Sequence, residues 1–170
     1  DHYKIPHFYI DVPINISDAS VSYVASQLKE LDMDLSKLTG KARDTAALKN
    51  VLQRSKNTVK NYKSYMAARA DKCLLQDLVT PLYEFVTMNI LLGTVPALKY
   101  PSMALNDALG APKAEGVRLF WIHTVPYLQN ELKNILNFSK KAQIVGIDMA
   151  SSALVDIDPD KPYEAMARRM

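Results

Sequence analysis

The 170-residue chain contains a single cysteine, Cys73. One thiol excludes an internal disulfide framework, and it cannot by itself hold a zinc ion or an iron–sulfur cluster. The sequence therefore predicts no metal ligands within this chain. Scarce cysteine is typical of a reducing compartment, so we expect a cytoplasmic protein. Lys72 is a nearby cation that favours a reactive thiolate at Cys73, but a structural or exposed thiol is the simpler interpretation.

Several other common signals are missing. The five glycines stand far apart, and neither GxGxxG nor GxxxxGK occurs, so no phosphate-binding loop is recognisable. No HxxxH or CxxC pair and no nucleophile elbow is present. The apolar runs are shorter than the ~20 residues of a membrane span, and no signal peptide is visible. The 21 lysines and arginines outnumber the 18 aspartates and glutamates, which gives a formal charge of +3, but they form no basic stripe. We therefore expect neither membrane nor nucleic acid as a partner.

The chain is nevertheless rich enough in apolar residues, at 48%, to bury a core. Apolar residues at helical spacing, with capping and breaking residues around them, predict three long helices and one short one. They run from Ser17 or Asp18 to Gly40, from Asp44 to about Ala70, from an N-cap at Thr80 to Gly93, and from Ser102 to Leu109. The last is expected to be short because Pro96, Pro101 and Pro112 punctuate its surroundings.

Three apolar runs are typical of buried strands: residues 5–13, 117–123 and 142–148. The second run, "VRLFWIH", hardly alternates, which predicts that both of its faces are covered. Between the second and third runs, residues 128–140 form an amphipathic pattern with its apolar residues inward. These residues are Leu128, Leu132, Ile135 and Leu136. Strand, helix and strand in so short a segment predict a βαβ unit with parallel strands.

The predicted class is α/β and helix-rich. Residues 1–13 are expected to end a preceding α/β domain, residues 14–112 to form a helical connector, and residues 113–170 to begin a second, Rossmann-like domain. Two strands cannot bury themselves, so we expect the chain to be a piece of a longer protein. Strands without neighbours on both sides promote self-association, which is expected for the isolated piece.

Ligands of open parallel sheets bind at the carboxyl ends of the strands, and three predicted strand ends are polar. His123 with Thr124 is one of them, and His123 there is either a proton carrier near a ligand or a histidine bonded to a backbone carbonyl. Tyr127 follows in the same loop and either lines a pocket or packs with its hydroxyl in water. Asp11 and Asp148 are better explained as turn or cap residues. No catalytic residue can be assigned from these patterns.

Three stretches together resemble one family. "HFYIDVP" followed by a helix ending in "LTGK", then "RLFWIHTVPYL", then "DIDPDKPYEAMARRM" occur in the order and spacing of 2-hydroxyglutaryl-CoA dehydratase and benzoyl-CoA reductase subunits. The resemblance covers nearly the whole chain. Each motif alone is weak, and it is their order along the chain that carries the resemblance.

The resemblance implies a subunit of two α/β domains that pairs with a related second subunit and acts on an acyl-CoA thioester. It implies a [4Fe-4S] cluster held by cysteines outside this segment, and a separate ATP-dependent iron–sulfur activator protein. An electron from the activator would form a ketyl radical on the thioester, from which water is eliminated; in the reductase branch an aromatic ring is reduced. His123, Thr124 and Tyr127 are then expected to line the cleft, while the segment alone is expected to be inactive.

Two further interpretations remain open at this point. The chain could be a non-enzymatic helical module that binds a partner protein, with a small α/β appendage. A flavodoxin-like nucleotide-binding domain is the other, and the missing phosphate loop and incomplete sheet disfavour it.

Overall fold

The computed structural model describes residues 6–138 and 140–170. Ile5 of the first predicted strand and Ser139 of the predicted helix at 128–140 lie outside these residues. The chain forms two compact units, one of Asp1–Leu52 with Ile157–Met170 (unit 1) and one of Gln53–Asp156 (unit 2). The predicted domain boundaries at 13/14 and 112/113 refer to a longer protein and stay predictions.

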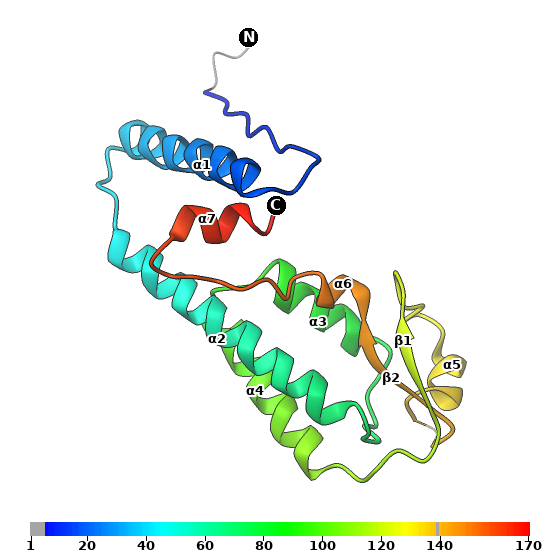
Figure 1. Cartoon of the computed structure of the whole chain (residues 1–170). Helices are drawn as coiled ribbons and strands as arrows, with labels where there is room; N and C mark the ends of the chain where they lie inside the picture. The colour runs from blue at the N-terminus through cyan, green and yellow to red at the C-terminus, as the bar shows by residue number, and fades with distance from the viewer. Residues whose placement is uncertain (1–5, 139) are drawn as a thin grey trace. The chain divides into compact units, whose positions relative to one another are not determined.

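Unit 1 is built on two helices that pack against each other, α1 (Asp18–Thr39) and α7 (Pro162–Ala167) (Figure 1). The Ser17 side chain accepts the backbone N–H of Ser20 and so caps α1. At the other end Gly40 takes the left-handed conformation with φ 66°, as the sequence predicts. The apolar cluster between the helices is small and consists of Val21, Val24, Ala25 and Ala167, with Ile10, Leu28 and Tyr163 packed against it.

The sequence predicts the bounds of α2 (Thr45–Arg69) almost to the residue. The boundary between the two units falls within this helix. Unit 2 continues with α3 (Thr80–Asn89), α4 (Val95–Gly110), β1 (Val117–Trp121), α5 (Asn130–Ile135), β2 (Ala142–Ile147) and α6 (Asp148–Ser151). β1 and β2 pair in parallel, with a shift of register between Leu119 and Phe120. The predicted βαβ unit and the α/β, helix-rich class are therefore confirmed.

The prediction of a strand at residues 5–13 is wrong for residues 6–13, which the structure describes. Residues 6–13 form no regular secondary structure and are mostly exposed. At Asp11 a side chain of α1, rather than another strand, satisfies the backbone. Gln27 accepts the N–H of Asp11 at 2.8 Å and donates to its carbonyl at 3.0 Å. Backbone groups paired in this way have no need of a strand partner.

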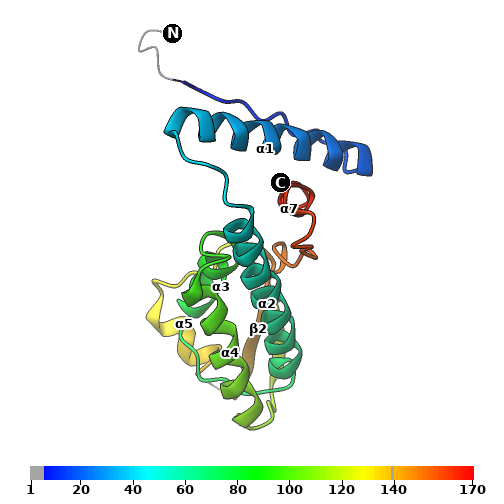
Figure 2. The ribbon, with the colours of Figure 1, turned by 90° about the vertical axis from the view of Figure 1, so that its left-hand side faces the viewer.

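The prediction that both faces of the second strand are covered is also wrong. Val117 and Phe120 are 62% and 52% exposed, whereas β2 is buried along most of its length. β2 lies between β1 and the helices, and Arg69 of α2 donates to the Val145 carbonyl at 2.6 Å (Figure 1). Figure 2 shows α2, α3 and α4 in front of β2. β1 lacks such a cover among the described residues, and self-association through its open edge stays a prediction.

Three helices differ in length from the prediction. α4 begins at Val95 rather than Ser102, because Thr94 caps it through the N–H of Ala97 and Pro96 fits the first turn. Pro101 lies inside the helix, where burial of its ring offsets the missing backbone hydrogen bond.

α5 is shorter than predicted and ends at Ile135. Beyond it the Asn137 side chain accepts the N–H of Ile144, which ties this backbone to β2 at 2.8 Å. Leu136 is buried as expected, but Leu128 and Ile135 are exposed. At α3 the N-cap is Val79 rather than Thr80, and the helix ends at Asn89, four residues before the predicted Gly93.

Across the residues described, no helix combines the length and the apolar character that a membrane crossing requires.

Candidate functional site

Unit 2 contains a cavity of about 90 Å³ at the carboxyl ends of β1 and β2. Its lining comes from α3, from the loop after β1 and from the junction of β2 with α6. The described lining residues are Leu78, Pro81, Leu82, Phe85, His123, Thr124, Val125, Tyr127, Ile147 and Met149. The cavity therefore occupies the position at which parallel sheets bind their ligands.

A single carboxylate oxygen fixes the loop that carries His123. Oδ1 of Asp148 accepts the backbone N–H of His123 at 2.9 Å and that of Met149 at 2.7 Å. Asp148 is the first residue of α6 and follows β2 directly, so the ends of the two strands meet at this side chain. The prediction that Asp148 bonds its own downstream backbone is confirmed, and it also holds the neighbouring loop.

His123 adopts a left-handed backbone conformation with φ 70°, the only non-glycine residue to do so in the described part of the chain. Among residues other than glycine, histidine tolerates this region comparatively well. Further along the loop, the ring N–H of Trp121 donates to the Thr124 carbonyl at 3.2 Å. These contacts turn the chain sharply at the end of β1 and bring Thr124 and Val125 to the cavity.

The cavity has an apolar floor and a polar rim. Leu78, Pro81, Val125 and Ile147 are buried and form the floor. His123, Thr124 and Tyr127 are exposed and form the rim. The three residues that the sequence selects as cleft-lining candidates thus line one cavity, and their role there stays a prediction.

The other candidates lie elsewhere. Asp11 is in unit 1, where its carboxylate accepts the Tyr23 hydroxyl at 3.2 Å. Cys73 is buried in unit 2, and its backbone N–H bonds to the Pro112 carbonyl at 2.8 Å. A buried thiol in this position agrees with the structural interpretation of Cys73.

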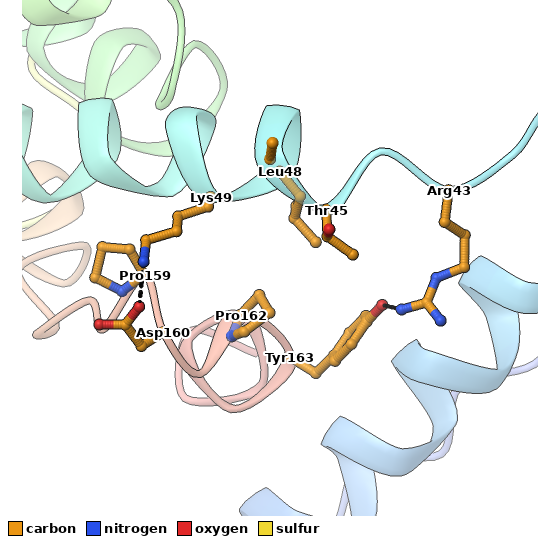
Figure 3. Close-up of a pocket in the computed structure, with 9 residues that line it drawn as sticks. Arg43, Thr45, Leu48, Lys49, Pro159, Asp160, Pro162 and Tyr163 are labelled. Carbon is orange, nitrogen blue, oxygen red and sulfur yellow. Dashed lines mark hydrogen bonds and ion pairs between the residues drawn. The ribbon is translucent and has the colours of Figure 1, made fainter.

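A second cavity, of about 310 Å³, lies within unit 1 (Figure 3). Two ion pairs flank it. Lys49 of α2 bonds to Asp160, and Arg43 bonds to the Tyr163 hydroxyl and to Asp32 of α1, the last at 2.6 Å. Each cation already faces a carboxylate, so the cavity carries little net charge for an anionic ligand to use.

Contacts around Tyr163 shift the pKa values of three side chains. A hydrogen bond from the Tyr163 hydroxyl, at 2.6 Å, lowers the pKa of Asp32, and the Arg43 guanidinium lowers it further. Burial and the bond to Asp32 raise the pKa of Tyr163. The bond to Asp32 also raises the pKa of Arg43.

Sequence reasoning missed a buried ionic cluster in unit 2. Arg69 of α2 and Glu84 of α3 form a bidentate ion pair with N–O distances of 2.5 and 3.1 Å. Their side chains are 3% and 0% exposed. The hydroxyl of Tyr62 donates to Glu84 at 2.6 Å, and Arg69 donates to that of Tyr65 at 2.7 Å. The spacing of Tyr62, Tyr65 and Arg69 places them on one helix face, which is a signal that the sequence offered.

Burial also shapes the tyrosines of this cluster. It is the main cause that raises the pKa of Tyr62, of Tyr65 and of the nearby Tyr100. For Arg69, burial opposes ionisation, but the Glu84 carboxylate together with Tyr65 and Tyr62 outweighs it and raises the pKa. The Tyr100 hydroxyl is buried and has no hydrogen-bond partner in the described part of the chain. The cluster holds α2 to α3 and, through Arg69, to β2.

The donor groups of this chain do not fit an iron–sulfur cluster. Such a cluster requires several thiolates, and Cys73 is the one cysteine of the chain. Within residues 6–138 and 140–170, no group of three or more histidine, cysteine, aspartate or glutamate side chains is placed to hold a metal ion.

The chain is thus a helix-rich α/β protein with a parallel βαβ unit and a cavity at the strand ends, the edge at which open parallel sheets bind their ligands. The family model described as "2-hydroxyglutaryl-CoA dehydratase, D-component" matches residues 1–170, the whole chain. The chain therefore belongs to this family. It is the family of one component of a 2-hydroxyacyl-CoA dehydratase, which implies a partner component. No curated protein and no solved structure matches the chain significantly.

Proposed function

We propose that this chain is the central part of a catalytic subunit of a [4Fe-4S]-dependent 2-hydroxyacyl-CoA dehydratase. The reaction is the radical elimination of water from an acyl-CoA thioester, a lyase activity of cytoplasmic, anaerobic amino-acid fermentation. A related second subunit and an ATP-dependent iron–sulfur activator protein complete the system. The observation that carries this proposal is the family match over the full length of the chain.

The cavity of unit 2 supports the part of the proposal that concerns the substrate. An acyl-CoA combines an apolar chain with a polar thioester, and this cavity combines a buried apolar floor with an exposed polar rim. Asp148 fixes the backbone of His123, so the imidazole belongs to a loop of defined conformation. A rim fixed before binding reduces the entropy lost when a ligand is positioned.

The contribution of this chain is limited to binding and orienting the thioester. A cluster would need cysteines from outside these residues, because Cys73 is single and buried. His123 and Tyr127 have groups able to hydrogen-bond the substrate carbonyl or hydroxyl. We assign them to the orientation of the substrate and leave the redox chemistry to other parts of the enzyme.

Two alternatives have less support. A benzoyl-CoA reductase-type subunit would hold a benzene ring, and the cavity of about 90 Å³ is smaller than the roughly 150 Å³ of a cavity known to bind benzene. A non-enzymatic helical interaction module would leave the strand-end cavity without a role.

The first test uses the intact protein, prepared without oxygen. Iron, acid-labile sulfide and the EPR spectrum of the reduced protein are measured, followed by conversion of a 2-hydroxyacyl-CoA to the enoyl-CoA with activator and ATP. We expect about four irons and four sulfides per subunit, and water elimination from the thioester. Absence of iron together with absence of turnover would contradict the proposal and favour the interaction module.

The second test concerns His123. Replacing it in the intact subunit, His123→Ala, should lower turnover or raise the KM by about tenfold, because a hydrogen bond to the thioester is lost. His7→Ala is the matched control, since His7 is also exposed but belongs to unit 1. Unchanged kinetics in His123→Ala with unchanged stability would remove His123 from the site.

A further inference from the structure

We propose that the strand-end cavity of unit 2 holds the apolar side chain of the 2-hydroxyacyl group, about three or four carbon atoms in size, and excludes a side chain that ends in a carboxylate. This inference rests on the proposed function and names its substrate class. It separates this chain from an enzyme for 2-hydroxyglutaryl-CoA, the compound in the name of its family.

The polarity of the cavity is the first argument. Among its described lining residues there is no lysine and no arginine, and the buried floor is wholly aliphatic. A carboxylate that enters such a floor loses its water and gains no cation in return, which is strongly unfavourable. The charged cations Arg43 and Lys49 line the other cavity, in unit 1, and each is paired with an aspartate there.

Size is the second argument. An aliphatic cavity of about 150 Å³ holds a benzene molecule, and this one measures about 90 Å³. The space therefore fits a short aliphatic group rather than an aromatic ring. Each methylene that is buried there tightens binding by roughly fourfold, so a chain of three carbons is enough for a clear preference.

The arrangement of rim and floor determines the orientation of the bound acyl group. His123, Thr124 and Tyr127 are exposed at the rim, while Val125, between them in the loop, belongs to the floor. An acyl group with its side chain on the floor leaves its 2-hydroxyl and thioester at the polar rim. The CoA moiety then stays in solvent or contacts other parts of the enzyme.

The experiment compares two thioesters that differ at one position. 2-Hydroxypentanoyl-CoA and 2-hydroxyglutaryl-CoA have the same five-carbon acyl chain, which ends in a methyl group in one and in a carboxylate in the other. Their Kd values for the intact, anaerobically prepared protein are measured by isothermal titration calorimetry, which needs no turnover. We expect 2-hydroxypentanoyl-CoA to bind at least about tenfold more tightly.

A pair of variants locates the preference. Leu82→Arg places a cation at the cavity, where Leu82 is partly exposed, and should reduce the preference or reverse it. Leu75→Arg is the matched control, because Leu75 is an exposed leucine of the same unit that does not line the cavity. The control should keep the preference of the unaltered protein.

The possible results distinguish this inference from the proposed dehydratase function on which it rests. Equal affinities, or tighter binding of 2-hydroxyglutaryl-CoA, overturn the inference and leave the dehydratase proposal standing. A preference for 2-hydroxypentanoyl-CoA that Leu82→Arg and Leu75→Arg alter equally also overturns it, since the preference then arises elsewhere. Binding of neither thioester overturns both.

Discussion

Different kinds of ionic contact stabilise the interiors of the two units of this chain. Unit 2 contains a fully buried ion pair, Arg69 with Glu84, to which two tyrosines are bonded. The main ionic contact of unit 1, Arg43 with Asp32, has side chains 31% and 36% exposed beside a small apolar cluster. Water screens exposed pairs, whereas a buried charge depends on its partner. Equivalent substitutions should therefore have unequal effects.

Arg69→Met should have the largest effect. It leaves the Glu84 carboxylate buried without its cation, and we expect a loss of about 3–5 kcal/mol in the free energy of unfolding. Arg43→Met in unit 1 is the control and should cost far less. Denaturant unfolding of both variants checks the difference, and equal losses would contradict the contrast between the units. The double variant Arg69→Met with Glu84→Gln should recover part of the stability, because no buried charge is left unpaired.

A second contrast lies within unit 2, between two glycines. A Cβ at Gly116 would lie 2.2 Å from the Lys141 carbonyl oxygen, whereas one at Gly110 would meet nothing within 4 Å. Gly116→Ala should cost about 1–3 kcal/mol, because the backbone must move. Gly110→Ala, at the end of α4, should be neutral or gain up to about 1 kcal/mol. Thermal unfolding of both variants measures this, and a neutral Gly116→Ala would disprove the close approach of the two segments.

Alkaline pH should weaken unit 2 through its tyrosines. Burial raises the pKa of Tyr62 and Tyr100 in the folded protein, while in the unfolded chain these groups titrate near pH 10. The contribution of these tyrosines to the free energy of unfolding is complete below about pH 10 and is lost as the pH rises above it. The reason is that the unfolded chain then releases protons that the folded chain retains. Tyr100→Phe, which loses no hydrogen bond in the described structure, should reduce this pH dependence. Denaturation across the alkaline range tests this, with the exposed Tyr83→Phe as the control.

Acid pH should have the smallest effect, in unit 1. The Tyr163 hydroxyl and then Arg43 lower the pKa of Asp32, so its contribution is present above about pH 4 and is lost as the pH falls below it. Because the pair is partly exposed, this loss should stay under about 1 kcal/mol. Asp32→Asn should remove the same dependence. A loss as large as that of Arg69→Met would contradict the contrast between the units.

The sequence predicts local features well because they depend on neighbouring residues. The Ser17 cap, the left-handed Gly40, the span of α2 and the order β1–α5–β2 follow from residues a few positions apart. The strand-end loop with His123, Thr124 and Tyr127 follows from the same βαβ pattern.

Features that depend on distant partners were predicted poorly. Whether β1 is covered depends on what packs beside it, and its apolar residues alone do not tell. Gln27 bonds the backbone of Asp11 from 16 residues away, and Glu84 reaches Arg69 from the next helix. In both cases the side chain type permits several partners, and only the fold selects one.

The most direct test of the central claim, that the strand-end cavity of unit 2 binds the acyl group, is hydrogen–deuterium exchange of the intact protein with and without 2-hydroxypentanoyl-CoA. The account predicts slower exchange in the loop at residues 122–128 and at Met149, with little change around Tyr163 in unit 1. Protection confined to the unit 1 cavity, or no protection in the loop at saturating thioester, would contradict it.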